Sequence, residues 1–141
     1  MQYTLAFIFS SDLQKVLLIT KNRPDYQAGK LNGIGGKIEP GEVPLEGMIR
    51  EVREETSLEI AADDWKFTGN IEGLDWKVWT YTTIYTGQMP DAVSVTDEAV
   101  VWYDVDHLPT HCMHNLFWLI PFALRKLTDE RIGELHCSYN V

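Results

Sequence analysis

The sequence predicts an α/β fold of the α+β type, because short strand-like segments are combined with two segments of helical periodicity. The strand-like segments are rich in β-branched and aromatic residues and are bounded by turn residues. The helical segments carry apolar residues three and four positions apart. With 141 residues, 45% of them hydrophobic, we expect a single domain over residues 1–141 with its own core.

Six segments are predicted as strands, which we expect to be mostly antiparallel. They are Tyr3–Phe9, Lys15–Thr20, a short strand within Leu31–Ile38, Lys66–Glu72, Trp76–Thr86 and Ala99–Asp104. Ser10, Ser11 and Asp12 separate the first two strands, which predicts a hairpin. The polar segment 21–30 contains Pro24 and Gly29 and is predicted to be a long loop.

Two helices are predicted. In the first, which begins at Pro44, the residues at positions i, i+3, i+4 and i+7 form one buried stripe, and these are Leu45, Met48, Ile49 and Val52. Proline is well suited to the first helical turn. The second helix is predicted over Asn115–Leu127, with Pro121 either kinking it or lying in its first turn.

The charge composition limits the kinds of partner. Twelve Lys and Arg against 21 Asp and Glu give a formal charge of −9, which disfavours binding to a nucleic-acid polymer. A small anionic substrate would need metal ions or a local basic patch. Two cysteines without a paired spacing favour a cytoplasmic protein, and the longest apolar run, Leu116–Leu124, is too short to cross a membrane. A homodimer is compatible with the sequence.

Three carboxylates on the first predicted helix share one side, because Glu51 lies about 40° from Glu55 and about 60° from Glu54 around the helix axis. Arg50 and Glu54 form an i, i+4 pair of opposite charge, whereas Glu51 and Glu55 have no such partner. The sequence of this helix, taken alone, leaves two interpretations open. The first is a solvated acidic face. The second is a site for a hard cation such as Mg²⁺, which prefers oxygen ligands.

The segment before this helix favours the second interpretation. Gly36, five residues, Glu42, seven residues and then Arg50–Leu58 match the pattern G-x5-E-x7-R-E-U-x-E-E-x-G-U at every fixed position but one, where U is aliphatic. This resembles the Nudix box of the MutT-like hydrolases. The departure is Ser57, where the family usually has a glycine in left-handed geometry, so we expect modest strain at the helix exit.

The resemblance implies a Nudix fold, a mixed β-sheet sandwiched between helices, and hydrolysis of a nucleoside diphosphate linked to a further group. It implies Mg²⁺, or Mn²⁺, as the cofactor. Arg50 would orient the carboxylates and Glu42 would pair with Arg50. Glu98 lies where such enzymes often place a fourth acidic group, and either Glu98 or a helix carboxylate would be the general base. The implied metal ligands are the carbonyl of Gly36 and the carboxylates of Glu51, Glu54, Glu55 and Glu98.

The segment Leu31–Lys37 resembles the Asn-Gly-x-Gly-Gly-Lys segment of the oxidised-purine triphosphatases. In those enzymes the residue corresponding to Asn32 reads the base, together with two aspartates at the start of the last helix. Here Asn115 and Leu116 occupy those two positions, which argues against a selective preference for 8-oxoguanine. The basic residues that flank the glycine-rich segment could contact phosphate, and these are Lys21, Arg23 and Lys37.

The leading interpretation is therefore a Mg²⁺-dependent enzyme that converts a nucleoside triphosphate to the monophosphate and pyrophosphate by water attack at phosphorus. Two alternatives stay open. One is a non-catalytic nucleotide-sensing or interaction module on the same fold, and the other is a Nudix enzyme that acts on a nucleoside diphosphate conjugate.

Overall fold

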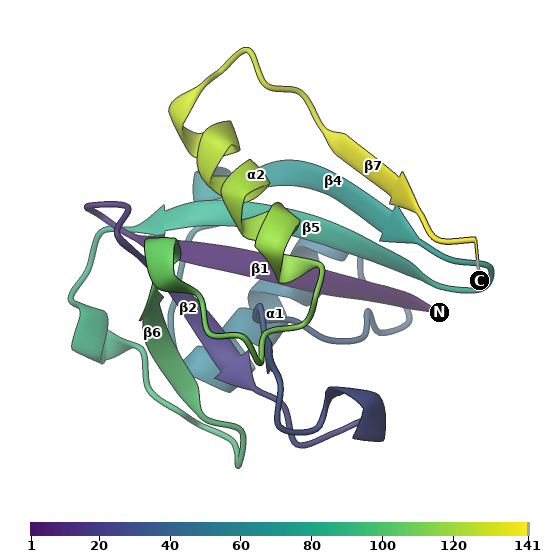
Figure 1. The fold of residues 1–141 in the computed structure, drawn as a ribbon, viewed down its shortest axis with the longest axis horizontal. Helices are drawn as coiled ribbons and strands as arrows, with labels where there is room; N and C mark the ends of the chain where they lie inside the picture. Colours follow the sequence, from purple (N-terminus) through teal and green to yellow (C-terminus); the bar gives the residue numbers. More distant parts are fainter. Residues whose placement is uncertain (141) are drawn as a thin grey trace.

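The structure, a computed structural model that describes residues 1–140, is a seven-stranded sheet with two helices (Figure 1). The strand order is β3-β2-β1-β5-β4-β7, and β6 pairs with β2. The strands are β1 (Gln2–Ser10), β2 (Lys15–Thr20), β3 (Leu31–Asn32), β4 (Lys66–Glu72), β5 (Lys77–Tyr85), β6 (Val100–Asp104) and β7 (Leu135–Ser138). The helices are α1 (Pro44–Thr56) and α2 (Leu116–Thr128).

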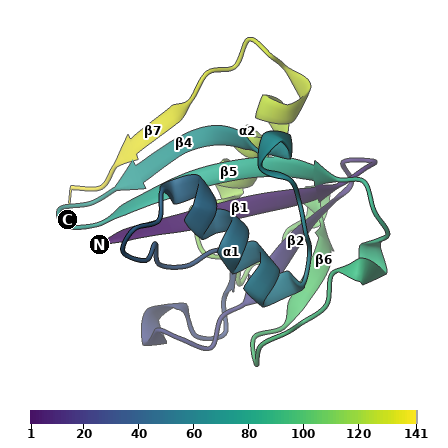
Figure 2. The ribbon, with the colours of Figure 1, turned by 180° about the vertical axis from the view of Figure 1, so that it is seen from behind.

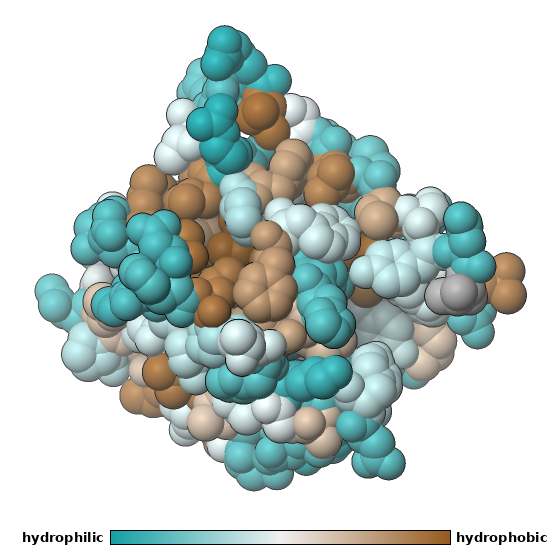
Figure 3. Space-filling view, in the orientation of Figure 1, coloured by the Kyte–Doolittle hydropathy of each residue, from teal (hydrophilic) through white to brown (hydrophobic). Residues whose placement is uncertain are grey.

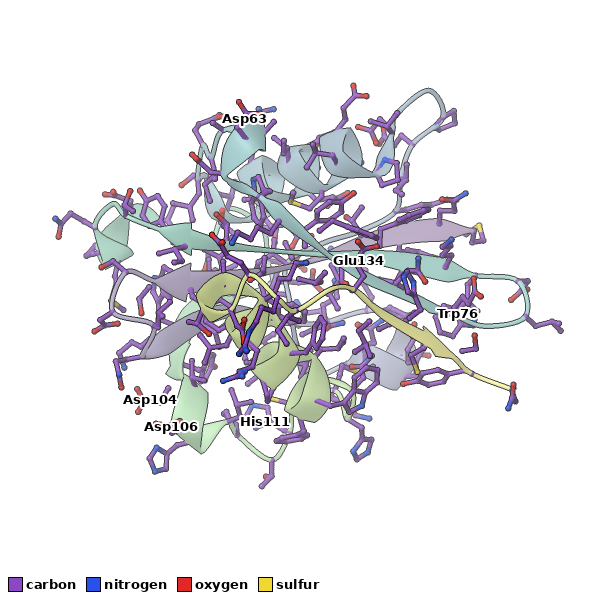
Figure 4. All side chains as sticks on the ribbon, turned by 90° about the horizontal axis from the view of Figure 1, so that it is seen from above. Asp63, Trp76, Asp104, Asp106, His111 and Glu134 are labelled. Carbon is purple, nitrogen blue, oxygen red and sulfur yellow. The ribbon has the colours of Figure 1, made fainter. Side chains whose placement is uncertain are left out.

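The two helices cover opposite faces of the sheet, as the front and back views show (Figures 1 and 2). Strand β1 lies inside the sheet and alternates between the two faces. Its residues Leu5, Phe7 and Phe9 belong to the core under α2, whereas Ala6 and Ile8 belong to the core under α1. The view along the sheet places Asp63 on the α1 side and His111 on the α2 side (Figure 4).

The predicted α+β class, the first hairpin and both helices are confirmed. Met48 and Val52 of the predicted stripe are buried, and the other two stripe residues pack against the same core. Pro121 lies inside α2, so it is not a first-turn proline. The expectation of mostly antiparallel strands is only partly correct, because β5 pairs with β1 in parallel and β7 pairs with β4 in parallel. The sheet is therefore mixed.

The predicted strand within Leu31–Ile38 is shorter than the segment suggests. Regular pairing with β2 covers only Leu31 and Asn32, and the rest of the segment touches β1 through isolated bridges. Glycines allow this close approach of two backbones. A β-carbon at Gly35 would overlap the carbonyl of Thr4, and one at Gly33 would lie 2.9 Å from the carbonyl oxygen of Ala6. The glycine-rich segment is thereby held against the central strand.

Strand β7 is not predicted from the sequence. Its four residues are too few for a period-2 pattern to be distinctive, and it forms only by pairing with β4.

The space-filling view shows an apolar area around α2, a helix whose Phe117 is 44% exposed (Figure 3). Among the described residues, no helix combines the length and the apolar character needed to span a bilayer.

Candidate active site

Arg50, midway along α1, is the centre of an ion-pair network that joins the acidic helix to the loop before it. Its guanidinium donates to both carboxylate oxygens of Glu42, at 2.7 and 3.0 Å, and to the backbone carbonyl of Lys37 at 3.0 Å. It also donates to Glu51 at 2.9 Å and to Glu54 at 3.2 Å. The hydrogen bonds from Arg50 lower the pKa of Glu42. This geometry agrees with the positioning roles expected for Glu42 and Arg50.

Glu51 is held between Arg50 and the glycine-rich segment. A β-carbon at Gly36 would lie 2.6 Å from the carboxyl carbon of Glu51, so any other residue there would displace this carboxylate from its position. The Gly36 carbonyl oxygen accepts the Thr4 backbone N–H at 2.8 Å and the Thr4 hydroxyl at 3.5 Å, which fixes its direction. Glu51 has no i, i+4 partner of opposite charge, and its cationic partner is the adjacent Arg50.

Glu55 differs from the other two helix carboxylates because it is buried, with 8% of its surface exposed. Burial, and then the negative charge of Glu51, raise the pKa of Glu55 to about 8, while the positive charge of Lys21 acts in the opposite direction. Its Oε2 atom has no hydrogen-bond partner among residues 1–140. Glu54, by contrast, has a side chain that is 56% exposed.

Glu98 reaches the same cluster from a distant part of the chain. It is 5% exposed and accepts a hydrogen bond from the Lys21 ammonium at 3.1 Å and from the backbone N–H of Asn22 at 2.7 Å. Its charge contributes to the raised pKa of Glu55, so these two carboxylates are near one another. The structure therefore brings Glu51, Glu55 and Glu98 together, with Lys21 paired to Glu98 and Arg50 paired to Glu51.

This donor set fits a hard divalent cation. Carboxylate and carbonyl oxygens are the ligands that Mg²⁺ prefers. The buried Oε2 of Glu55 without a partner, and the like charges gathered around it, are features that a bound cation would satisfy. Within residues 1–140, no three His, Cys, Asp or Glu side chains already form a preorganised metal site, and Arg50 occupies oxygens of Glu51 and Glu54. The carboxylates would have to reorient to share one ion.

The two asparagines expected to read the base occupy different environments. Asn32, at the end of β3, accepts the backbone N–H of Gly33 at 2.9 Å and donates to Gln27 at 3.1 Å. Asn115 precedes α2, and its buried Oδ1 has no partner in the described part of the chain. The next residue, Leu116, is fully buried in the core and offers a ligand nothing. A buried acceptor without a donor points to a ligand that brings one.

The basic residues are not gathered into one phosphate site. Arg23 forms a bidentate contact with Asp97, at 3.1 and 3.3 Å, and both side chains are largely exposed. Lys21 is engaged with Glu98, whereas the Lys37 side chain is exposed on the surface. Sequence reasoning treated Lys21 only as a phosphate contact. Its role as the partner of a buried carboxylate depends on a residue 77 positions away, which no local pattern reveals.

Ser57 adopts the left-handed geometry that its position in the box predicts. It ends α1 with φ 64° and ψ 3°, and its backbone N–H donates to the carbonyl of Arg53. The side-chain hydroxyl donates to the carbonyl of Asp91 at 3.2 Å. The serine therefore offsets part of its backbone strain by a contact to the segment that follows β5.

Replacing Ser57 by Gly should stabilise the protein by up to about 1 kcal/mol, because glycine relieves the left-handed strain while an exposed hydrogen bond contributes little. Ser57→Ala keeps the strain and loses the same exposed hydrogen bond, so it should destabilise the protein by no more than about 0.5 kcal/mol. Urea unfolding of the three proteins measures whether the free energy of unfolding decreases from the glycine variant to the wild type to the alanine variant. An alanine variant as stable as the glycine variant would contradict this account.

Comparisons with known proteins identify the family of the chain. The family model described as "NUDIX domain" matches residues 2–118. The chain is 30% identical over 120 residues to an oxidized purine nucleoside triphosphate hydrolase of Danio rerio, covering 79% of this chain and 73% of that protein. It is 28% identical over 113 residues to the Mus musculus protein of the same name, covering 76% and 68%.

Solved structures show the same fold. The MutT protein of Bacillus halodurans has a TM-score of 0.71 at 21% identity, covering 99% of this chain and 88% of that one. The Nudix domain of Shewanella oneidensis NrtR, complexed with ADP ribose, has a TM-score of 0.69 at 20% identity, covering 90% and 88%. The mixed sheet between two helices, with an acidic helix beside a glycine-rich segment, is the architecture of a Nudix domain. The chain belongs to the Nudix family and is a MutT-like hydrolase.

Proposed function

We propose that this enzyme hydrolyses a nucleoside triphosphate to the monophosphate and pyrophosphate in a Mg²⁺-dependent reaction. The observation that carries the proposal is the cluster of Glu51, Glu55 and Glu98, in which a buried carboxylate oxygen lacks a partner among the described residues. Such a cluster is costly without a cation. The relatives named as oxidized purine nucleoside triphosphate hydrolases support a triphosphate as the substrate class.

In this mechanism the water oxygen attacks phosphorus, the phosphoanhydride bond breaks, and the proton passes to a carboxylate. Bound Mg²⁺ supplies charge neutralisation for the pyrophosphate and stabilises the leaving oxygen. Glu51, Glu54 and Glu55 would bind it, with Glu98 and the Gly36 carbonyl as further ligands. Arg50, held by Glu42, keeps the helix carboxylates in place. Glu98 or a helix carboxylate takes the proton.

The reaction is tested with a panel of nucleotides and Mg²⁺, with separate detection of pyrophosphate and orthophosphate. We expect pyrophosphate and a monophosphate, and no turnover in excess EDTA. Release of orthophosphate would contradict the proposal. Nucleotide binding by calorimetry without turnover would favour a non-catalytic sensing module, and cleavage of a diphosphate conjugate alone would favour the other alternative.

Base selection is proposed to depend on Asn32 and Asn115. A wrong base would leave a buried amide group unpaired, which costs about 1–3 kcal/mol, so preferences of roughly tenfold to a hundredfold are expected. Asn32→Ala and Asn115→Ala should flatten the ratios of kcat/KM among triphosphates more than they lower the best rate. Unchanged ratios in both variants would show that the base is read elsewhere.

A further inference from the structure

The proposed base-reading amide of Asn32 belongs to a chain of hydrogen bonds that runs into the loop before β3. Asn32 Nδ2 donates to Gln27 Oε1 at 3.1 Å, and Gln27 Nε2 donates to the Tyr26 hydroxyl oxygen at 3.0 Å. At its other end, the Gly33 backbone N–H donates to Asn32 Oδ1 at 2.9 Å. Tyr26 is 68% exposed, whereas Gln27 and Asn32 are half-buried.

The direction of this chain is set by its one fixed donor. A backbone N–H cannot act as an acceptor, so Gly33 places Asn32 Oδ1 on its own side and Nδ2 on the other. Gln27 Oε1 then meets Nδ2 as an acceptor. A flipped Asn32 amide would lose both contacts, because Nδ2 would face the Gly33 N–H and Oδ1 would face Gln27 Oε1.

The backbone of Gln27 is fixed by hydrogen bonds within the loop. Its N–H donates to the carbonyl of Pro24 at 2.9 Å, and its carbonyl accepts the N–H of Lys30, also at 2.9 Å. The loop is closed at its base by two hydrogen bonds between Lys21 and the 29–30 segment, at 2.7 and 2.8 Å. The Gln27 side chain therefore starts from a fixed point close to the site.

Counting donors and acceptors shows what remains for a ligand. An asparagine amide has two hydrogens and two lone pairs. Gln27 uses one hydrogen and Gly33 uses one lone pair, so Asn32 presents one donor beside one acceptor in a fixed order. An amide that can rotate would offer the two groups in either order and would discriminate less between base edges.

We propose that Gln27 is a positioning residue that fixes the amide of Asn32 and thereby sharpens the selection of the base. The inference rests on the proposed function, because it needs Asn32 to contact the base. It goes beyond that proposal by assigning base selectivity to a loop side chain that need not touch the substrate.

The test compares Gln27→Leu, which removes the acceptor, with Gln27→Glu, which keeps it. Gln14→Leu, an exposed change in the first hairpin, is the matched control. We expect Gln27→Leu to reduce the kcat/KM ratio between the best and the worst triphosphate about threefold to tenfold, mainly through KM. Gln27→Glu should keep the ratio, while its added charge raises KM for all triphosphates alike. The control should match the wild type.

A second readout does not need turnover. In ¹⁵N-resolved NMR spectra, the Asn32 side-chain amide is assigned by its loss in Asn32→Ala. We expect slower solvent exchange for its hydrogen-bonded proton in the wild type and in Gln27→Glu, and faster exchange in Gln27→Leu. Equal exchange in all three proteins, or an unchanged base profile in Gln27→Leu where Asn32→Ala alters it, would overturn the inference.

The two proposals can fail separately. If Asn32→Ala leaves the base profile unchanged, base reading by Asn32 is wrong and the selectivity role of Gln27 falls with it, even where the exchange data show the contact. If Asn32→Ala alters the profile and Gln27→Leu does not, the proposed base reading stands and only the positioning role is overturned.

Discussion

Replacing Glu55 by Gln is expected to lower turnover at least about a hundredfold while the protein stays folded. Glutamine has the same shape as a protonated glutamate, which is the form that burial favours in the metal-free protein. It cannot supply the negative oxygen that a cation needs. Glu51→Gln and Glu54→Gln should also cause large losses of turnover. Of these two residues, only Glu54 has a mostly exposed side chain.

The matched control for these variants is Glu46→Gln. Glu46 lies in the first turn of α1, is exposed, and accepts the backbone N–H of Val43 at 3.3 Å, a contact that glutamine can keep. This control removes one charge from the same helix away from the cluster, so its turnover should stay near that of the wild type. The measurement is initial rate against Mg²⁺ concentration. Near-normal turnover of Glu55→Gln at limiting Mg²⁺ would show that Glu55 is not a ligand.

The second large effect concerns stability in EDTA as the pH changes. Between the ordinary pKa of a glutamate and about 8, the unfolded chain has released the Glu55 proton and the folded protein retains it. Raising the pH through this range therefore destabilises the fold. The loss in the free energy of unfolding should be on the order of 2–4 kcal/mol between pH 5 and pH 8.

Glu55→Gln should remove this slope, so that the variant becomes more stable than the wild type at pH 8 and differs little near pH 5. Glu46→Gln should keep the wild-type slope. Urea unfolding at several pH values measures the free energy of unfolding of each protein. The contributions of the other titrating groups cancel when the value for one protein is subtracted from that for another. Parallel curves for the wild type and Glu55→Gln would show that Glu55 is not buried with a raised pKa.

The sequence predicts those parts of the fold that depend on local periodicity. The apolar run of β1 identifies a strand, and the stripe through Met48 and Val52 identifies a helix and its buried face. Local periodicity carries no information on which strands become neighbours. The parallel pairing of β5 with β1 and the short strand β7 are therefore properties of the assembled sheet, decided by packing between segments far apart in the chain.

The sequence likewise predicts some features of the candidate site and not others. The spacing from Gly36 to Glu55 identifies the acidic helix and its loop, and the Glu42–Arg50 contact follows from the resemblance. The sequence does not predict that Glu55 is buried while Glu54 is exposed. Lys21 and Glu98, which come from distant parts of the chain, lie near Glu55 and influence its pKa. The Gln27–Asn32 contact is equally invisible, because a polar loop residue usually faces water.

The last strand, β7, lies outside the residues that the family model matches, and a single glycine permits it to dock. Gly69 has φ 136°, and a β-carbon there would overlap the carbonyl of Leu135. Any side chain at residue 69 would therefore push the C-terminal segment away from β4. The border of the sheet would then be β4 instead of the shorter β7, and a longer exposed edge is a better template for association between chains. The glycine at residue 69 thus lets a four-residue strand, in place of the seven-residue β4, form this border of the sheet.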